Sequence, residues 1–175
     1  QEQWRAHLGE VQANLDRLLQ DRAAAMLSGD EDAFLATVDA DDAYLLSSER
    51  FWFERLDQYP ATELTLTAQP ITLFSSGDVL ARVTMDYTAA DQSDQLKQDQ
   101  TTIDVLFTVA GDGYRWAGLA SQTLAGESVT IRFPEGRQAL AESLLHESEQ
   151  HYASLAKTLE IQAPQPIIIE LYPDR

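Results

Sequence analysis

Apolar residues recur at steps of three and four positions along the first 27 residues of the chain. This period places them on one stripe of an amphipathic helix and leaves Glu10, Asp16 and Asp21 on the opposite side. The sequence therefore predicts a long helix over residues 3–27, with the apolar positions Trp4, Leu8, Val11, Leu15, Leu18, Leu19, Ala23 and Met26.

Two shorter helices are predicted next. Gly29 suits the position after a helix, and Asp30 can cap the next one, which we expect over residues 31–38. One aspartate of the segment 39–42 is expected to cap a third helix over residues 44–59, which a proline ends.

Alternation of apolar and polar residues then predicts four antiparallel strands. The last two form a hairpin over residues 101–120, around the turn Gly111-Asp112-Gly113. Pro70 implies a bulge or an edge position in the first strand, because proline cannot donate to a ladder. The polar segment 91–100 is expected to be a loop.

The alternation also assigns the two faces of this sheet. The charged residues Arg82, Asp86, Asp104 and Arg115 share one face, and opposite charges there predict cross-strand pairs on an exposed surface. The other face is expected to lie beneath the helices and carries Val83, Met85, Tyr87, Val105, Phe107, Tyr114 and Trp116.

The pattern changes after residue 125 to strand, long helix and strand. The β-branched run 167–171 suits a buried strand, and we expect it to pair in parallel with residues 129–133. Such a unit cannot cover its own faces, so we expect a larger domain that continues beyond Arg175. The predicted buried stripe of the helix is Leu140, Leu144, Tyr152, Leu155 and Leu159.

Composition narrows the class of protein. The formal net charge of -17 disfavours partners that carry phosphate, whether nucleic acid or anionic lipid. Cysteine is absent, so disulfides, thiolate metal sites and a cysteine nucleophile are excluded. No apolar run is long enough for a membrane helix, and no signal peptide is visible. Because the chain begins at Gln1, we expect a mature or trimmed form whose leader is gone.

Residues 1–125 resemble the NTF2-like, cone-shaped α+β superfamily. The residues that carry this resemblance are AAAMLSGDEDAFLATVD and FTVAGDGYRWAGLA. The resemblance implies an α+β fold in which three N-terminal helices lie on a curved four-stranded antiparallel sheet, followed by the strand-helix-strand crossover unit. Residues 126–175 resemble the opening segment of peptidase MA-like, gluzincin-type metallopeptidase domains, through VTIRFPEGRQALAESLLHESEQHYASLAKTLEIQAPQPIIIELYPDR.

The metallopeptidase resemblance implies a zinc site that this chain does not carry. An HExxH motif places two histidines four residues apart on one helix face. Here His146 and His151 are five residues apart, roughly 140° around a helix, and Gln150 occupies the fourth position. We therefore expect no metal and no cofactor in this chain.

NTF2-like folds often hold a pocket between the sheet and the helices, where an isomerase would need an ionisable group. The candidate lining residues are Trp52, Tyr87, Phe107 and Trp116. The same side chains can simply fill the core, which we favour. No acid or histidine falls on that face, so no catalytic residue is assigned.

The sequence therefore favours a non-catalytic NTF2-like accessory or interaction module of a larger extracytoplasmic, metallopeptidase-like protein. Its expected partner is the downstream domain of the same polypeptide, and a homodimer through the sheet face or the C-terminal segment stays open. The alternative is a small-molecule-binding protein, or an isomerase or dehydratase, that uses the pocket of the cone.

Overall fold

The computed structural model describes residues 2–56, 61–90, 95–160 and 166–171. The chain forms two compact units, Gln1–Leu119 and Ala120–Arg175. The fold class is α+β, as predicted: helices on a four-stranded antiparallel sheet, then a small mixed sheet with one helix.

Three helices open the first unit: α1 (Glu2–Ser28), α2 (Glu31–Leu35) and α3 (Ala43–Phe53). Asp30 caps α2 and Asp42 caps α3, because each carboxylate accepts hydrogen bonds from backbone N–H groups of the first turn. Both capping predictions are confirmed. The two short helices are shorter than predicted, and the expected extension of α3 through residues 57–59 lies outside the described residues.

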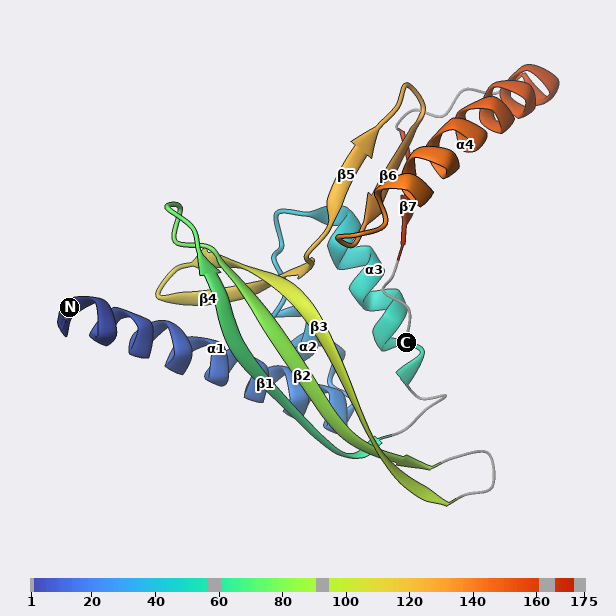
Figure 1. Cartoon of the computed structure of the whole chain (residues 1–175). Helices are drawn as coiled ribbons and strands as arrows, with labels where there is room; N and C mark the ends of the chain where they lie inside the picture. Colours follow the sequence, from blue (N-terminus) through green and yellow to red (C-terminus); the bar gives the residue numbers. More distant parts are fainter. Residues whose placement is uncertain (1, 57–60, 91–94, 161–165, 172–175) are drawn as a thin grey trace. The chain divides into compact units, whose positions relative to one another are not determined.

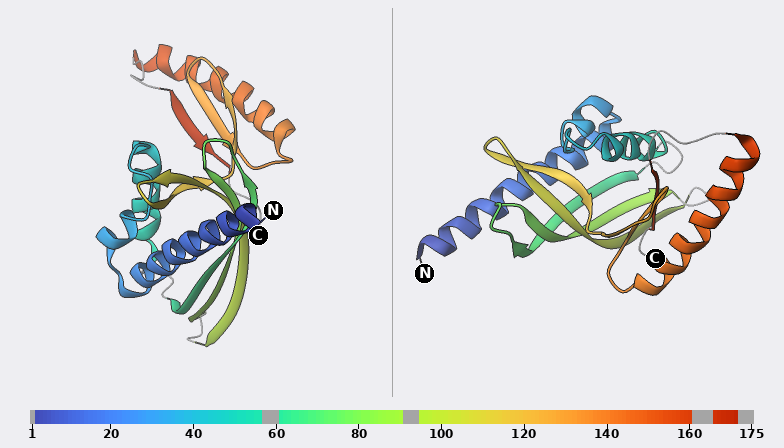
Figure 2. Two further views of the ribbon diagram at one scale, coloured as in Figure 1. Left: turned by 90° about the vertical axis from the view of Figure 1, so that its left-hand side faces the viewer. Right: turned by 90° about the horizontal axis from the view of Figure 1, so that it is seen from above.

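The large sheet has the order β1-β2-β3-β4, with all neighbours antiparallel. Its strands are β1 (Ala61–Leu73), β2 (Val79–Ala90), β3 (Leu96–Ala110) and β4 (Gly113–Leu119). Helix α1 lies across one face of this curved sheet (Figures 1 and 2). The shared core includes Leu15 and Leu19 of α1 with Val83, Val105 and Phe107 of the strands.

One loop prediction was wrong. Residues 96–100 continue β3 because they pair with residues 86–90 of β2, although all of them except Leu96 have polar side chains. A ladder of backbone hydrogen bonds can extend beyond the covered part of a sheet, where no apolar alternation marks it. Residues 91–94 of that predicted loop lie outside the described residues.

The register of the large sheet shifts at three places, the first of them between Ala61 and Glu63 of β1. The register of β1 shifts between Pro70 and Thr72, and β1 is an edge strand. The prediction that Pro70 lies at a bulge or in an edge strand is therefore confirmed. The register of β4 shifts next to Gly118, whose φ of 94° favours glycine. A Cβ at Gly118 would also lie 3.1 Å from Leu45 Cδ1 of α3.

The second unit contains β5 (Gln122–Ala125), β6 (Val129–Phe133), α4 (Gln138–Leu159) and β7 (Ile167–Glu170). Its sheet has the order β5-β6-β7, and β7 pairs with β6 in parallel, as predicted. Strand β5 pairs antiparallel with β6 and does not extend the first sheet. The division after Leu119 therefore comes six residues before the predicted boundary at residue 125.

The buried stripe of α4 differs from the prediction. The side chains that join the core of this unit are Ala141, Leu144, Leu145 and Tyr152, whereas Leu140, Leu155 and Leu159 are exposed. Small Ala141 brings the helix close to the strands and turns Leu140 away. With 22 residues, α4 is roughly 33 Å long, whereas the five residues of β6 span roughly 17 Å. The last turns of the helix therefore extend past the sheet.

Candidate functional site

The structure brings together two of the four residues predicted to line a pocket. Phe107 and Trp116 are both buried, and their rings meet edge to face with centroids 5.7 Å apart. Trp52 is 40% exposed and stacks on Phe34 instead. Tyr87 is half-buried and donates a hydrogen bond of 3.2 Å to Asp99, its partner across the strands. The expectation that no acid falls on this face is therefore wrong: the sequence interpretation took residues 91–100 for a loop, and the strand continues through exposed Asp99.

A buried cation lies next to this aromatic pair. Arg22 of α1 is only 3% exposed, and its guanidinium carbon lies 4.0 Å from the ring centroid of Phe34 and 4.2 Å from that of Trp116. The guanidinium donates to Thr37 Oγ1 at 3.0 Å and forms an ion pair with Glu49 of α3. Burial lowers the pKa of Arg22, and the charge of Glu49 opposes that shift.

The sequence interpretation did not identify Arg22. The signal that could have found it is its position, since Arg22 lies three residues after buried Leu19 and four before Met26, on the apolar stripe of α1. A charged residue on such a stripe requires a buried partner. Glu49 is 27 residues away in the sequence, and only the packing of α3 against α2 brings it close.

Trp116 fixes the segment before α3 to the edge of the sheet. Its backbone N–H donates to Thr37 O at 2.8 Å, and its carbonyl accepts from Asp39 N–H at 2.9 Å. The indole Nε1 is buried and has no hydrogen-bond acceptor among the described residues. Trp116 is therefore both a contact of the buried cation and an unsatisfied polar donor in the interior.

The carboxylates predicted for the opposite face do lie on that face. Arg82 and Asp104 are directly opposite each other on β2 and β3 and form two hydrogen bonds, of 2.9 and 3.2 Å. Asp86 accepts a hydrogen bond from Gln100. The pair with Asp104 raises the pKa of Arg82. The prediction of cross-strand pairs between opposite charges is therefore confirmed for Arg82 and Asp104. It is wrong for the other two residues, because Asp86 bonds the neutral Gln100 and Arg115 donates to the carbonyl of Tyr114.

The histidines of α4 do not form a metal site in the described residues. Gln150 donates a hydrogen bond of 2.9 Å to His146 Nε2, and His151 is exposed. In the part of the chain that the structure describes, no three metal-ligating side chains come together. Over the same residues, no helix combines the length and apolarity that a membrane crossing requires.

The class that the fold defines is an α+β protein whose first unit has an apolar core between α1 and the sheet. No family model and no curated protein matches the chain. The structure is similar to Aln2 from a Streptomyces species, with a TM-score of 0.44 and 12% identity over 59% of this chain and 83% of that chain.

A second solved structure, the intermembrane space region of the chloroplast protein ARC6, has a TM-score of 0.41 and 16% identity. The match covers 63% of this chain and 97% of that chain. Both similarities are distant, and nothing about the activity of this chain follows from them.

Proposed function

We propose that this chain is a non-catalytic accessory or interaction module, with an NTF2-like first unit, from a larger extracytoplasmic, metallopeptidase-like protein. The observation that carries the proposal is the segregation of side chains across the sheet. The interior around Phe107 and Trp116 is occupied by aromatic and aliphatic side chains, and the carboxylates of Asp86 and Asp104 lie on the outer face.

This segregation disfavours acid–base catalysis in the interior. A general acid or base must lie within hydrogen-bond reach of its substrate in an enclosed site. Among the described residues, Arg22 and Thr37 are buried, and Glu49 and the backbone already use their hydrogen-bonding groups. The hydroxyl of buried Tyr114 donates to Gly77 O, and the indole of Trp116 can only donate. On the outer face of the sheet, the carboxylate of Asp104 accepts two hydrogen bonds from the guanidinium group of Arg82.

A positional role follows for the module. The outer face aligns polar residues in rows across three strands, such as Thr67, Thr84 and Thr102. Such a regular polar surface supports contact with another protein surface, and we propose the downstream domain of the same polypeptide as that partner. The other possible partner is a second copy of this chain that binds through the same face. Sedimentation velocity would detect such a homodimer.

One observation favours the alternative, a protein that binds a small molecule in its interior. The indole N–H of Trp116 lacks an acceptor among the described residues, and a ligand carbonyl would supply one. An isomerase or dehydratase that uses the pocket of the cone would place its substrate carbonyl there.

The two functions can be separated by NMR spectroscopy of the indole N–H signals in the ¹⁵N-labelled chain. The probes are cyclohexanone and a steroid ketone, and the exposed Trp52 is the internal control. An accessory module predicts no saturable shift of the Trp116 signal, because aromatic and aliphatic side chains pack around Trp116. A saturable shift at Trp116 without one at Trp52 would establish the small-molecule function instead.

A further inference from the structure

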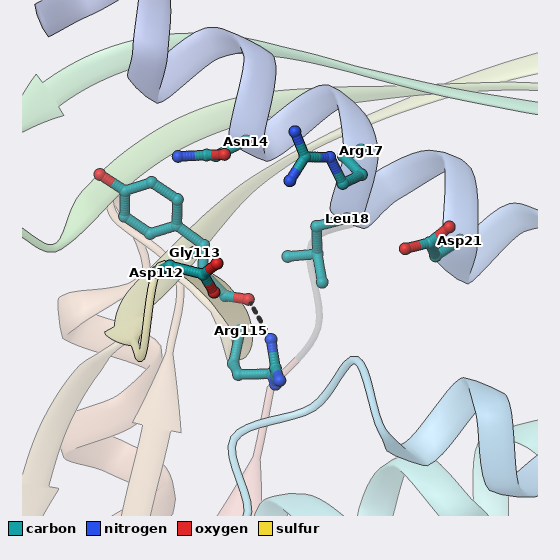
Figure 3. Close-up of a pocket in the computed structure, with 8 residues that line it drawn as sticks. Asn14, Arg17, Leu18, Asp21, Asp112, Gly113 and Arg115 are labelled. Atoms are coloured by element: carbon teal, nitrogen blue, oxygen red, sulfur yellow. Dashed lines mark hydrogen bonds between the residues drawn. The ribbon is translucent and has the colours of Figure 1, made fainter.

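A small polar hollow lies in the first unit between α1 and the β3–β4 hairpin. Asn14, Arg17 and Asp21 line it from α1, and Asp112 and Arg115 line it from the β3–β4 turn and β4 (Figure 3). The three helical residues are three and four positions apart, so they share one side of α1. Buried Leu18 contributes an apolar part of the wall.

The two arginines in the hollow differ from the paired arginines of the first unit. Arg22, Arg50 and Arg82 each form an ion pair with a carboxylate. Among the described residues, neither Arg17 nor Arg115 has a carboxylate oxygen within 4.0 Å. Carboxylates are abundant, since the chain carries 29 acidic residues against 12 basic ones. Arg55, the other described arginine of this unit that has no carboxylate partner, lies over the ring of Phe51 instead.

The acids of the hollow are also unpaired. Within the described residues, Asp21 and Asp112 have no cationic nitrogen within 4.0 Å, although both line the same hollow as the two arginines. Asn14 makes no hydrogen bond through its side chain to another described residue. Two cations, two anions and an amide therefore surround one space without satisfying one another.

The chemistry of this lining selects the kind of ligand. A simple anion would meet Asp21 and Asp112 in addition to the net charge of -17, and a simple cation would meet both guanidinium groups. The volume of the hollow is about 140 Å³, well below the roughly 300–1,000 Å³ of pockets for drug-sized ligands. The ligand must therefore be small and must carry both signs of charge.

We propose that the hollow binds a small zwitterion, with the carboxylate on Arg17 and Arg115 and the ammonium group on Asp21 and Asp112. The guanidinium fork can hold a carboxylate with two parallel hydrogen bonds. The amide of Asn14 can donate a further hydrogen bond to the carboxylate. A free α-amino acid has this combination of groups in a molecule of this size.

The test is an NMR titration of the ¹⁵N-labelled chain with L-alanine as the zwitterion, acetate as the anion and methylammonium as the cation. L-Alanine is expected to give saturable shifts at the backbone of Gly113, Tyr114 and Arg115 and at the side-chain amide of Asn14. Acetate and methylammonium are expected to bind at least about tenfold more weakly, because each loses one set of charge-assisted hydrogen bonds.

Matched variants assign the binding to the hollow. Arg17→Gln is expected to raise the Kd for L-alanine at least about tenfold. Asp112→Asn is expected to weaken the binding of L-alanine but not the binding of acetate, which has no ammonium group. Arg50→Gln is the control, since Arg50 is an exposed arginine of the same unit that pairs with Glu31. Arg17 is itself exposed, so its substitution leaves the fold intact.

Shifts that stay linear with ligand concentration, or a Kd for L-alanine that Arg17→Gln does not change, would overturn the proposal. Equal binding of acetate and L-alanine would overturn it too.

Discussion

At the residue scale, the Arg22–Glu49 pair determines how tightly the helices of the first unit are held. Moving a guanidinium out of water costs several kcal/mol, and a single neutral hydrogen bond such as that to Thr37 does not offset this cost. The two aromatic rings against Arg22 each stabilise the cation by about 2 kcal/mol when it is desolvated. The negative charge of Glu49 has to supply much of the rest.

Removing Glu49 should therefore destabilise the first unit strongly. We expect Glu49→Ala to lower the free energy of unfolding by about 3–5 kcal/mol, because it leaves a buried charge without its partner. The measurement is urea unfolding followed by the fluorescence of the tryptophans. The double variant Arg22→Met, Glu49→Leu should recover most of the loss, since it removes both charges and keeps the volume.

The control is the exposed pair of Arg50 and Glu31, in the same unit. Glu31→Ala should cost less than about 1 kcal/mol, because water solvates both groups. A similarly small loss for Glu49→Ala would mean that water reaches Arg22 and that the interior is not closed.

At the scale of elements, the turn between β5 and β6 is fixed by a side chain from α4. Glu149 Oε1 accepts hydrogen bonds of 2.8 Å from the backbone N–H groups of both Ser128 and Val129. Gly126 makes room for this carboxylate, since a Cβ there would meet Glu149 Oε1 and would lie 3.0 Å from Leu145 Cδ1. These backbone hydrogen bonds lower the pKa of Glu149.

The lowered pKa predicts a pH-dependent stability of the second unit. A carboxylate whose pKa is lowered in the folded state stabilises that state above its usual pKa, 4.5, and loses this effect as the pH falls through the folded value. We expect the protection of the β6 amides from hydrogen exchange to fall below about pH 4.5. Glu149→Gln should remove most of this dependence, whereas Glu147→Gln, an exposed residue of the same helix, should keep it. Equal pH dependence in the two variants would contradict the role of Glu149.

At the scale of the whole molecule, the apolar pattern predicted the parts of the fold that bury one face. The alternation along β2, β3 and β4 predicted which side of the sheet Phe107 and Asp104 would occupy, because the period of two leaves no other choice. The β-branched run of β7 predicted its parallel pairing with β6. The pattern did not reveal β5 because Gln122–Ala125 is a short, mostly exposed strand.

The sequence was less informative about the candidate sites. Phe107 and Trp116 share one face at paired positions, so their contact followed from register. Arg22 and Glu49 meet through the packing of short helices, and the hollow joins α1 to a turn about a hundred residues later. Contacts of this kind depend on tertiary geometry, which single-sequence periodicity does not encode.

The central claim is that the interior of the first unit is closed and filled. Hydrogen exchange of the Trp116 indole N–H tests it most directly, because this group is buried and has no acceptor among the described residues. A closed interior predicts exchange at least about a hundredfold slower than at the indole of Trp52, since water reaches Trp116 only through local unfolding. If the two indoles exchanged at the same rate, water would fill the space beneath α1, and a binding pocket would replace the packed core.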